Sequence, residues 1–337
     1  MKRQSLFFTN PYKIEIQEKT LAPLEPGEML VQTQYSAISP GTELLIYRGH
    51  APTELAADEN ISALGGSLTF PLQYGYSAVG TVVEVGNDLS PKWIDRAVFS
   101  FQPHQTHFIA TPEQVIPLPE GISPRSGVFL PNMETATNFL MDGQPLIGER
   151  VVVFGQGIVG LLTTALLSKF PLKDLLTLDL YPNRRAASLD AGATHSFDPS
   201  KPTTLSQVRN ENGIDLVYEL SGSPKSLDQA ISVTGFAGRV VVGSWYGQKR
   251  VSLDLGGHFH RSRIQIISSQ VSSLAPSVSG RWNKSRRFDL AWEMIHQVQP
   301  ERWITHRLPF EQAAQGYHLL DQNPKDVIQV LLDYTQT

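Results

Sequence analysis

Residues 149–179, with the sequence ERVVVFGQGIVGLLTTALLSKFPLKDLLTLD, decide the fold of this chain. The apolar, β-branched run at 151–154 is typical of a strand that is buried on both faces. A G-x-G-x-x-G pattern at 155–160 ends it, and the residues that follow, 161–170, place apolar side chains on one face of a helix. A second apolar run ends in Asp179. The order predicts a strand, a tight turn, a helix and a second strand.

Each residue type in this unit meets a requirement of a bound dinucleotide. Gly155 permits the tight turn, Gly157 allows a pyrophosphate to approach the backbone, and Gly160 lets the helix pack closely on the strand. The N–H groups at the start of the helix hold the phosphates, and Asp179 accepts hydrogen bonds from the hydroxyls of the adenosine ribose. Glycines that merely make a turn are the alternative, and the complete unit argues against it. We therefore predict cofactor contacts from Gly155, Gln156, Gly157, Ile158, Val159, Gly160 and Asp179.

Composition restricts the possible classes of protein. The chain has 337 residues, which suits two domains, and 41% hydrophobic with 18% charged residues is typical of a globular protein. Its net charge of −4 gives no electrostatic basis for binding nucleic acid. Because cysteine is absent, disulfides, thiolate nucleophiles and sulfur-based zinc sites are excluded. We find neither a signal-peptide pattern nor an apolar run of membrane length, and we expect a cytoplasmic protein without membrane insertion.

The pattern of elements divides the chain into three segments. Residues 1–131 consist mostly of predicted strands and loops, with a short helix at 42–47 that Thr42 would cap. In residues 132–272 strands alternate with helices, which predicts an α/β, doubly wound parallel sheet with its ligand at the carboxyl ends of the strands. Residues 273–337 contain two amphipathic helices and a final strand, and we expect them to return to the first segment.

Further cofactor contacts are predicted where the later strands of the sheet end. Asp179 would repel a 2′-phosphate, so NAD is favoured over NADP. Arg184 is a candidate for stacking on adenine, or it is an ordinary solvated helix residue. Serine and glycine are also common in ordinary turns, so the prediction of cofactor contacts at the later strand ends rests on the position of these residues and not on their type. The residues are Ser221, Gly222, Gly243, Ser244 and Ser269.

Seven segments in register resemble the medium-chain dehydrogenase/reductase family. The resemblance implies a GroES-like, mostly-β catalytic domain with an inserted Rossmann domain, a cleft for nicotinamide and substrate, and a homodimer or homotetramer. Other stretches, among them SAISPGTELLIYRG and FQPHQTHF, look most like a bacterial branch that includes bacteriochlorophyllide dehydrogenases. The family resemblance rests on residues 26–43, 75–86, 155–160, 179–195, 215–224, 238–247 and 306–332.

The chain departs from the zinc alcohol dehydrogenases of this family at the metal ligands. Pro40 stands where those enzymes have a ligand cysteine, and Tyr76-Ser77 stands where they have a His-Glu pair. The region of the third ligand, 130–134, has neither cysteine nor histidine. We therefore predict no metal site and no zinc.

A substitute metal site is the alternative. His104-x-x-His107 with Glu43 or Glu134 supplies ligand types that zinc accepts. Such a spacing converges well only on a helix, and Pro103 and the strand-like flank argue against one. Solvated or hydrogen-bonded histidines are the preferred interpretation.

Without zinc, a hydrogen-bond donor must stabilise the substrate oxygen. We predict that Tyr76 binds this oxygen, that Thr42 assists through its hydroxyl and that Glu43 orients the network. The alternative is that Tyr76 only fills space. For Asn132 and Glu134 two interpretations stay open, a place beside the nicotinamide or a polar cluster at a helix start.

The sequence predicts an NAD(H)-dependent, zinc-independent oxidoreductase that interconverts an alcohol and a ketone or aldehyde. A quinone or enone reductase of the same fold and a catalytically inactive nucleotide-binding protein are the alternatives. Three aromatic residues, Trp245, Tyr246 and Trp282, together with a polar surface excursion or lid at 51–70, suggest a roomy cleft for a bulky or aromatic small molecule.

Overall fold

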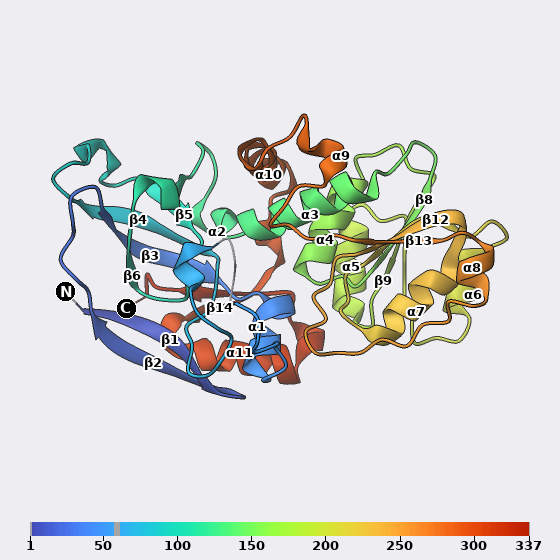
Figure 1. The fold of residues 1–337 in the computed structure, drawn as a ribbon, viewed down its shortest axis with the longest axis horizontal. Coiled ribbons are helices and arrows are strands. Elements are labelled where there is room, and N and C mark those ends of the chain that lie inside the picture. The colour runs from blue at the N-terminus through green and yellow to red at the C-terminus, as the bar shows by residue number, and fades with distance from the viewer. Residues whose placement is uncertain (1, 57–60, 337) are drawn as a thin grey trace. The chain divides into compact units, whose positions relative to one another are not determined.

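The computed structural model describes residues 2–56 and 61–336, and it divides into two compact units (Figure 1). Residues 1–131 and 299–337 form the first unit, and residues 132–298 form the second. The second unit therefore extends to Val298, past the boundary at 272 that the sequence suggested. The reason is helix α10 (Lys284–Val298), which packs against helix α4 (Ile158–Leu167) of the same unit.

The second unit is built on a six-stranded parallel sheet (Figure 1). Its strand order, β10-β9-β8-β11-β12-β13, corresponds to 3-2-1-4-5-6 in chain order, which is the doubly wound arrangement. The predicted α/β fold class is confirmed. The strands are β8 (Arg150–Phe154), β9 (Asp174–Leu178), β10 (His195–Phe197), β11 (Ile214–Glu219), β12 (Thr234–Val242) and β13 (Gln265–Ser268).

Strand β8 is buried on both faces, as its β-branched sequence predicts. Val151 and Val153 lie in an apolar cluster with Phe139 of α3, whereas Val152 and Phe154 lie in a second cluster that includes residues of α7. The alternation of side chains along a strand produces this division. Besides α4 and α10, the helices of this unit are α3 (Leu130–Gly143), α5 (Pro182–Asp190), α6 (Thr204–Arg209), α7 (Pro224–Val233), α8 (His258–Arg261) and α9 (Pro276–Ser279).

A seven-stranded sheet in the first unit takes strands from both of its chain segments, 1–131 and 299–337. Its order is β14-β15-β3-β4-β5-β7, and β6 also pairs with β3. Strand β15 runs antiparallel to β3, with Leu331 opposite Ala37, so the C-terminal tail completes this sheet. A separate hairpin consists of β1 (Lys2–Asn10) and β2 (Lys13–Thr20). The sheet strands are β3 (Met29–Ala37), β4 (Ala78–Val85), β5 (Ala97–Ser100), β6 (His107–Ala110), β7 (Ile116–Pro117), β14 (Ile304–Pro309) and β15 (Gln329–Asp333).

Helix α1 (Pro40–Tyr47) begins earlier than predicted. Ser39, not Thr42, occupies the N-cap position, and Thr42 lies in the first turn. Proline fixes φ near the helical value and lacks the N–H that the first turn leaves unpaired, so Pro40 suits the first helical position. The other helices of this unit are α2 (Pro124–Gly127) and α11 (Ala313–Gln322), and α11 packs against α1.

The segment 51–70 is not simply a surface excursion. Ala51, Leu64 and Leu68 are buried in the apolar cluster that contains residues of α1 and α11. Residues 57–60, which belong to the same prediction, lie outside the described residues. Among the helices of the described part of the chain, none is long and apolar enough to cross a membrane.

Candidate functional site

The glycine turn between β8 and α4 is closely packed at two of its three glycines. Gly155 has a φ of +88°, and a Cβ atom there would lie 2.7 Å from the Cα of Ser221. A Cβ atom on Gly160 would lie 2.0 Å from the carbonyl oxygen of Gly155. At Gly157, in contrast, no atom lies within 4 Å of the Cβ position. The turn is therefore tight where strand and helix meet and open at its middle glycine.

The open glycine lies at the N-terminus of α4. The first hydrogen bond of this helix runs from the Leu161 N–H to the Gly157 carbonyl, at 2.9 Å. The N–H groups of Ile158, Val159 and Gly160 precede it and have no acceptor within the helix, because the first turn offers none. Three donors and the positive end of the helix dipole thus lie beside open space, an arrangement that suits a phosphate.

Asp179 follows β9 and contacts the same turn. Its Oδ2 accepts a hydrogen bond of 2.7 Å from the Gln156 N–H, and its Oδ1 accepts one of 2.9 Å from the Tyr181 N–H. The Gln156 side chain is buried and accepts a hydrogen bond from Thr164, so only its backbone faces Asp179. These contacts fix a carboxylate beside the open glycine.

The two arginines after Asp179 have different surroundings. The Arg184 guanidinium lies 5.0 Å from the ring centroid of Tyr181. Arg185 donates to the carbonyl oxygens of Asp179 and Leu180, each at 2.8 Å. Arg185 therefore supports the turn after β9, and Arg184 stays the candidate for stacking on a base.

A buried carboxylate, Glu219, which is not among the predicted site residues, joins the ends of β11 and β12. Glu219 accepts hydrogen bonds from the Ser221 N–H (2.8 Å), from the Ser221 hydroxyl and from the Tyr246 phenol (2.7 Å). The Gly222 N–H donates to the Ser244 hydroxyl at 2.8 Å. The structure thus brings Ser221, Gly222 and Ser244 together. The only signal in the sequence was a charged residue at the end of an apolar strand.

Tyr246 and Gly243 have structural roles in this region. Burial and the adjacent carboxylate of Glu219 raise the pKa of Tyr246, so its phenol stays protonated and donates to that carboxylate. A Cβ atom on Gly243 would lie 2.3 Å from the ring of Phe139, so close packing alone requires glycine there.

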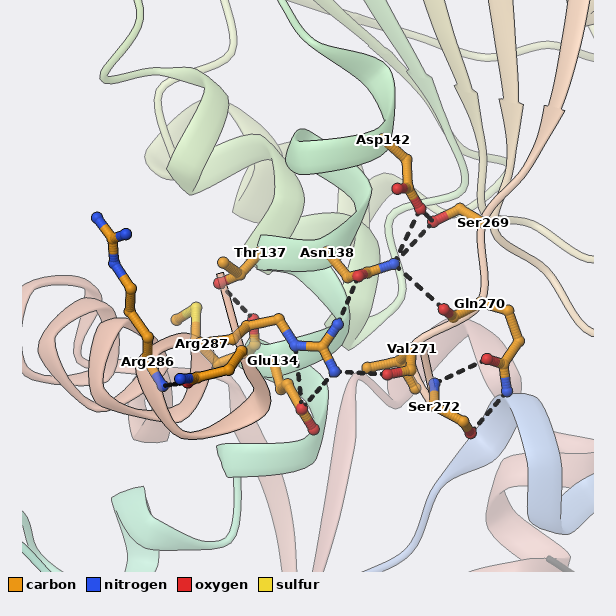
Figure 2. A network of polar contacts seen from close by, with 12 residues as sticks. Glu134, Thr137, Asn138, Asp142, Ser269, Gln270, Val271, Ser272, Arg286 and Arg287 are labelled. Carbon is orange, nitrogen blue, oxygen red and sulfur yellow. Dashed lines mark hydrogen bonds and ion pairs between the residues drawn. The ribbon is translucent and has the colours of Figure 1, made fainter. Parts of the chain in front are cut away.

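Ser269, which follows β13, belongs to a polar network that includes α3 and α10 (Figure 2). Its hydroxyl donates to Asp142 at 2.5 Å and accepts a hydrogen bond from Asn138 at 3.2 Å. Glu134 forms a buried ion pair with Arg287. Burial raises the pKa of both Asp142 and Glu134, and nearby polar or charged groups oppose the rise.

In the first unit, Glu43 is fully buried at the centre of a second network. It accepts hydrogen bonds from the Ser39 N–H (2.8 Å) and the Tyr317 phenol, and His104 Nε2 lies 3.0 Å away. The other nitrogen of His104 is 2.7 Å from the Ser36 hydroxyl. His104 and Tyr317 are residues of this network that the sequence did not connect to Glu43.

Tyr76 is linked to this network through Ser39. The phenol of Tyr76 is hydrogen-bonded to the Ser39 hydroxyl, and the Ser39 N–H is bonded to Glu43. The ring of Tyr76 also packs against the apolar cluster beside α1, as expected if Tyr76 only fills space. Thr42 is half-buried on the same helix as Glu43. Two of the three predicted catalytic residues thus share one hydrogen-bonded system.

Known proteins resemble this chain over most of its length. Residues 159–288 match the family described as zinc-binding dehydrogenase. Sorbitol dehydrogenase 1 of Saccharomyces cerevisiae is 24% identical over 307 residues, which cover 79% of this chain and 82% of the relative. These matches confirm the resemblance of the chain to the zinc-binding dehydrogenase family. The chain is an oxidoreductase of the alcohol dehydrogenase type.

Solved structures share the fold of this dehydrogenase. An rspB alcohol dehydrogenase from Escherichia coli CFT073, complexed with NADH, superposes with a TM-score of 0.80 at 18% identity and covers 99% of both chains. A dehydrogenase from Sinorhizobium meliloti 1021, bound to NADP, has a TM-score of 0.78 at 17% identity and likewise covers 99% of both chains.

The family name implies zinc, but the residues of this dehydrogenase do not fit such an ion. Within 2–56 and 61–336, no group of three or more His, Cys, Asp or Glu residues is arranged to hold a metal. Pro40 offers no ligand atom, and the Ser77 hydroxyl donates to the Val128 carbonyl. Both nitrogens of His104 are engaged by Ser36 and Glu43.

Proposed function

We propose that this dehydrogenase uses NAD(H) to interconvert an alcohol and a ketone or aldehyde by hydride transfer, without a zinc ion. The observation that carries the proposal is the Asp179 carboxylate, held beside an open glycine and the free N–H groups of α4. When bound, the nicotinamide accepts or supplies the hydride. The substrate class is supported by the alcohol dehydrogenase character of the relatives.

The preference for NAD follows from the charge and hydrogen bonding of Asp179. Each carboxylate oxygen accepts one backbone N–H, and an ionised carboxylate has about four acceptor sites. Acceptor sites therefore remain for the ribose hydroxyls, whereas a 2′-phosphate would be repelled. The fold does not decide between the cofactors, since one similar structure holds NADH and another NADP.

For the substrate, we propose that the Tyr76 phenol donates a hydrogen bond to the reacting oxygen. Its bond to Ser39 connects it to the buried Glu43, which then orients rather than contacts the substrate. Thr42 supplies a second hydroxyl from the first turn of α1. Fixed donors of this kind stabilise the negative charge that develops on a carbonyl oxygen during hydride transfer.

The cofactor proposal is tested by titrating purified protein with NADH and with NADPH and following nicotinamide fluorescence. We expect at least about tenfold tighter binding of NADH, which corresponds to about 1.4 kcal/mol. Asp179→Ala should reduce this preference, and Asp190→Ala, a change of an exposed carboxylate at the end of α5, serves as the control. Equal affinities of the wild type for both cofactors would show that Asp179 does not select NAD.

Metal analysis of the same preparation should find well under one zinc ion per chain. The same protein should turn over alcohols and ketones. A stoichiometric zinc whose removal abolishes turnover would refute the zinc-independent proposal. Turnover of quinones or enones in preference to alcohols would favour the alternative reductase. A bulky or aromatic substrate, a homodimer or homotetramer and a cytoplasmic location stay predictions of the sequence.

A further inference from the structure

The segment that follows β13 is held at three successive residues (Figure 2). The Ser269 hydroxyl donates to Asp142, and the Asn138 amide donates to the Gln270 carbonyl oxygen at 3.4 Å. The Arg287 guanidinium donates to the Val271 carbonyl oxygen at 2.6 Å. Side chains of α3 and α10 thus fix the path of the chain where it leaves the sheet.

Arg287 is the centre of this arrangement. It is only 1% exposed. Its Nε and Nη2 donate to one oxygen of Glu134, at 3.1 and 2.7 Å, and its Nη1 donates to the Asn138 amide oxygen at 2.6 Å. With Val271 included, one planar group satisfies three acceptor residues that lie in different directions. Asn138 extends this network, because its amide nitrogen donates hydrogen bonds to the Asp142 carboxylate, the Ser269 hydroxyl and the Gln270 carbonyl oxygen.

The topology assigns the held segment to one half of the nucleotide site. In a parallel sheet all carboxyl ends lie at the same edge, and a doubly wound sheet binds one mononucleotide on each side of its switch point. The order of the sheet places β9, which Asp179 follows, on one side of β8. Strand β13, which Ser269 follows, lies on the other side, beyond β11 and β12. The adenosine half belongs to the first side and the nicotinamide half to the second.

We propose that Arg287 is a positioning residue for the nicotinamide ring of the cofactor. It holds residues 269–271 ready before binding, directly at the Val271 carbonyl and through Asn138 at Ser269 and Gln270. The proposal rests on the proposed function. The driving effect is preorganisation: a segment that is already ordered loses less conformational entropy when the ligand binds.

A lysine at position 287 tests the geometry of Arg287 while it keeps the charge. A lysine ammonium is a point charge with three donors and cannot reproduce the planar fork of a guanidinium. Arg287→Lys therefore keeps a partner for Glu134 but loses bonds to Val271 or Asn138. Arg286→Lys is the matched control, since Arg286 is exposed and its guanidinium lies 4.0 Å over the ring of Trp282. Figure 2 shows the Arg286 side chain directed away from the network.

The experiment compares NADH with ADP-ribose, which has the adenosine, the pyrophosphate and the second ribose but no nicotinamide. Both are titrated into the wild type, Arg287→Lys and Arg286→Lys by calorimetry. We expect Arg287→Lys to weaken NADH binding by about tenfold and ADP-ribose binding by less than twofold. Arg286→Lys should change neither. The Arg287→Lys enzyme should also show a lower kcat, since the ring is held less firmly.

Equal weakening of NADH and ADP-ribose by Arg287→Lys would overturn the inference, because it would show a merely structural role for Arg287. Unchanged NADH binding would overturn it as well. If Arg287→Lys does not fold, Asn138→Ala carries the same test, because it removes the bonds to Ser269 and Gln270 and leaves the ion pair with Glu134. Failure of the proposed NAD(H) dependence is a separate outcome, since the wild type would then bind neither nucleotide.

Discussion

Alanine at two glycines of the same turn should have two different effects: Gly160→Ala should lower the stability of the protein, and Gly157→Ala should weaken NADH binding. A methyl group on Gly160 would lie 2.0 Å from the carbonyl oxygen of Gly155, so strand β8 and helix α4 must move apart. Overpacking of this kind costs about 1–3 kcal/mol. Alanine also improves helix propensity over glycine by about 1 kcal/mol, which offsets part of the cost. Because the 2.0 Å contact is with backbone, the overpacking cost lies in the upper part of that range, about 2–3 kcal/mol. We therefore expect Gly160→Ala to destabilise the protein by about 1–2 kcal/mol.

At Gly157 the same methyl group meets no atom within 4 Å, and the residue has a φ of −69°, which alanine adopts readily. Gly157→Ala should therefore change the free energy of unfolding by less than about 1 kcal/mol, the usual size of an N-cap effect. The open space is where we place the pyrophosphate, so the methyl group should weaken NADH binding by at least about tenfold, or 1.4 kcal/mol.

The assays are thermal unfolding without cofactor and fluorescence titration with NADH. For a domain of the size of the second unit, 1 kcal/mol corresponds to roughly 2–4 °C in Tm. Gly160→Ala should lower Tm by several degrees, and Gly157→Ala should leave Tm nearly unchanged while it weakens binding. Unchanged NADH affinity of Gly157→Ala would contradict a pyrophosphate beside Gly157, and full stability of Gly160→Ala would contradict close packing at Gly160.

Two further predictions concern the polar networks. Tyr76→Phe should lower kcat/KM by about 10²-fold, the usual effect of losing one donor to a developing oxyanion, and should leave NADH affinity unchanged; unaltered turnover in steady-state kinetics would show that the phenol only packs. Asp142 has a pKa above its ordinary value of 3.8, chiefly because of burial, so its ionised form destabilises the folded state. This penalty is absent below the ordinary pKa and grows as the pH rises through the folded pKa. Asp142→Asn should therefore be more stable than the wild type at pH 7 and equally stable near pH 3.5; urea unfolding at both pH values measures the difference, and a stability gain that persists at pH 3.5 would contradict the assignment.

Local sequence determined the nucleotide-binding unit. The β-branched run at 151–154, the glycine pattern and the following helix lie within one short stretch. The spacing of apolar residues in the strand and the helix indicates which side chains are buried. The helix predicted at 42–47 is correct in type but begins earlier, at Pro40, because proline is suited to the first helical position.

Only the tertiary structure decided the two polar networks. Arg287 lies 153 residues from Glu134, and Tyr317 lies 274 residues from Glu43, yet each pair is in hydrogen-bond contact. Nothing in the local pattern distinguishes a buried arginine from its exposed neighbour Arg286, because burial here depends on which face of α10 packs on the rest of its unit. The sequence by itself determined the elements and the cofactor turn, since these depend on short-range geometry and periodicity. The partners of the buried charges depend on contacts between distant segments, which form only when the units fold.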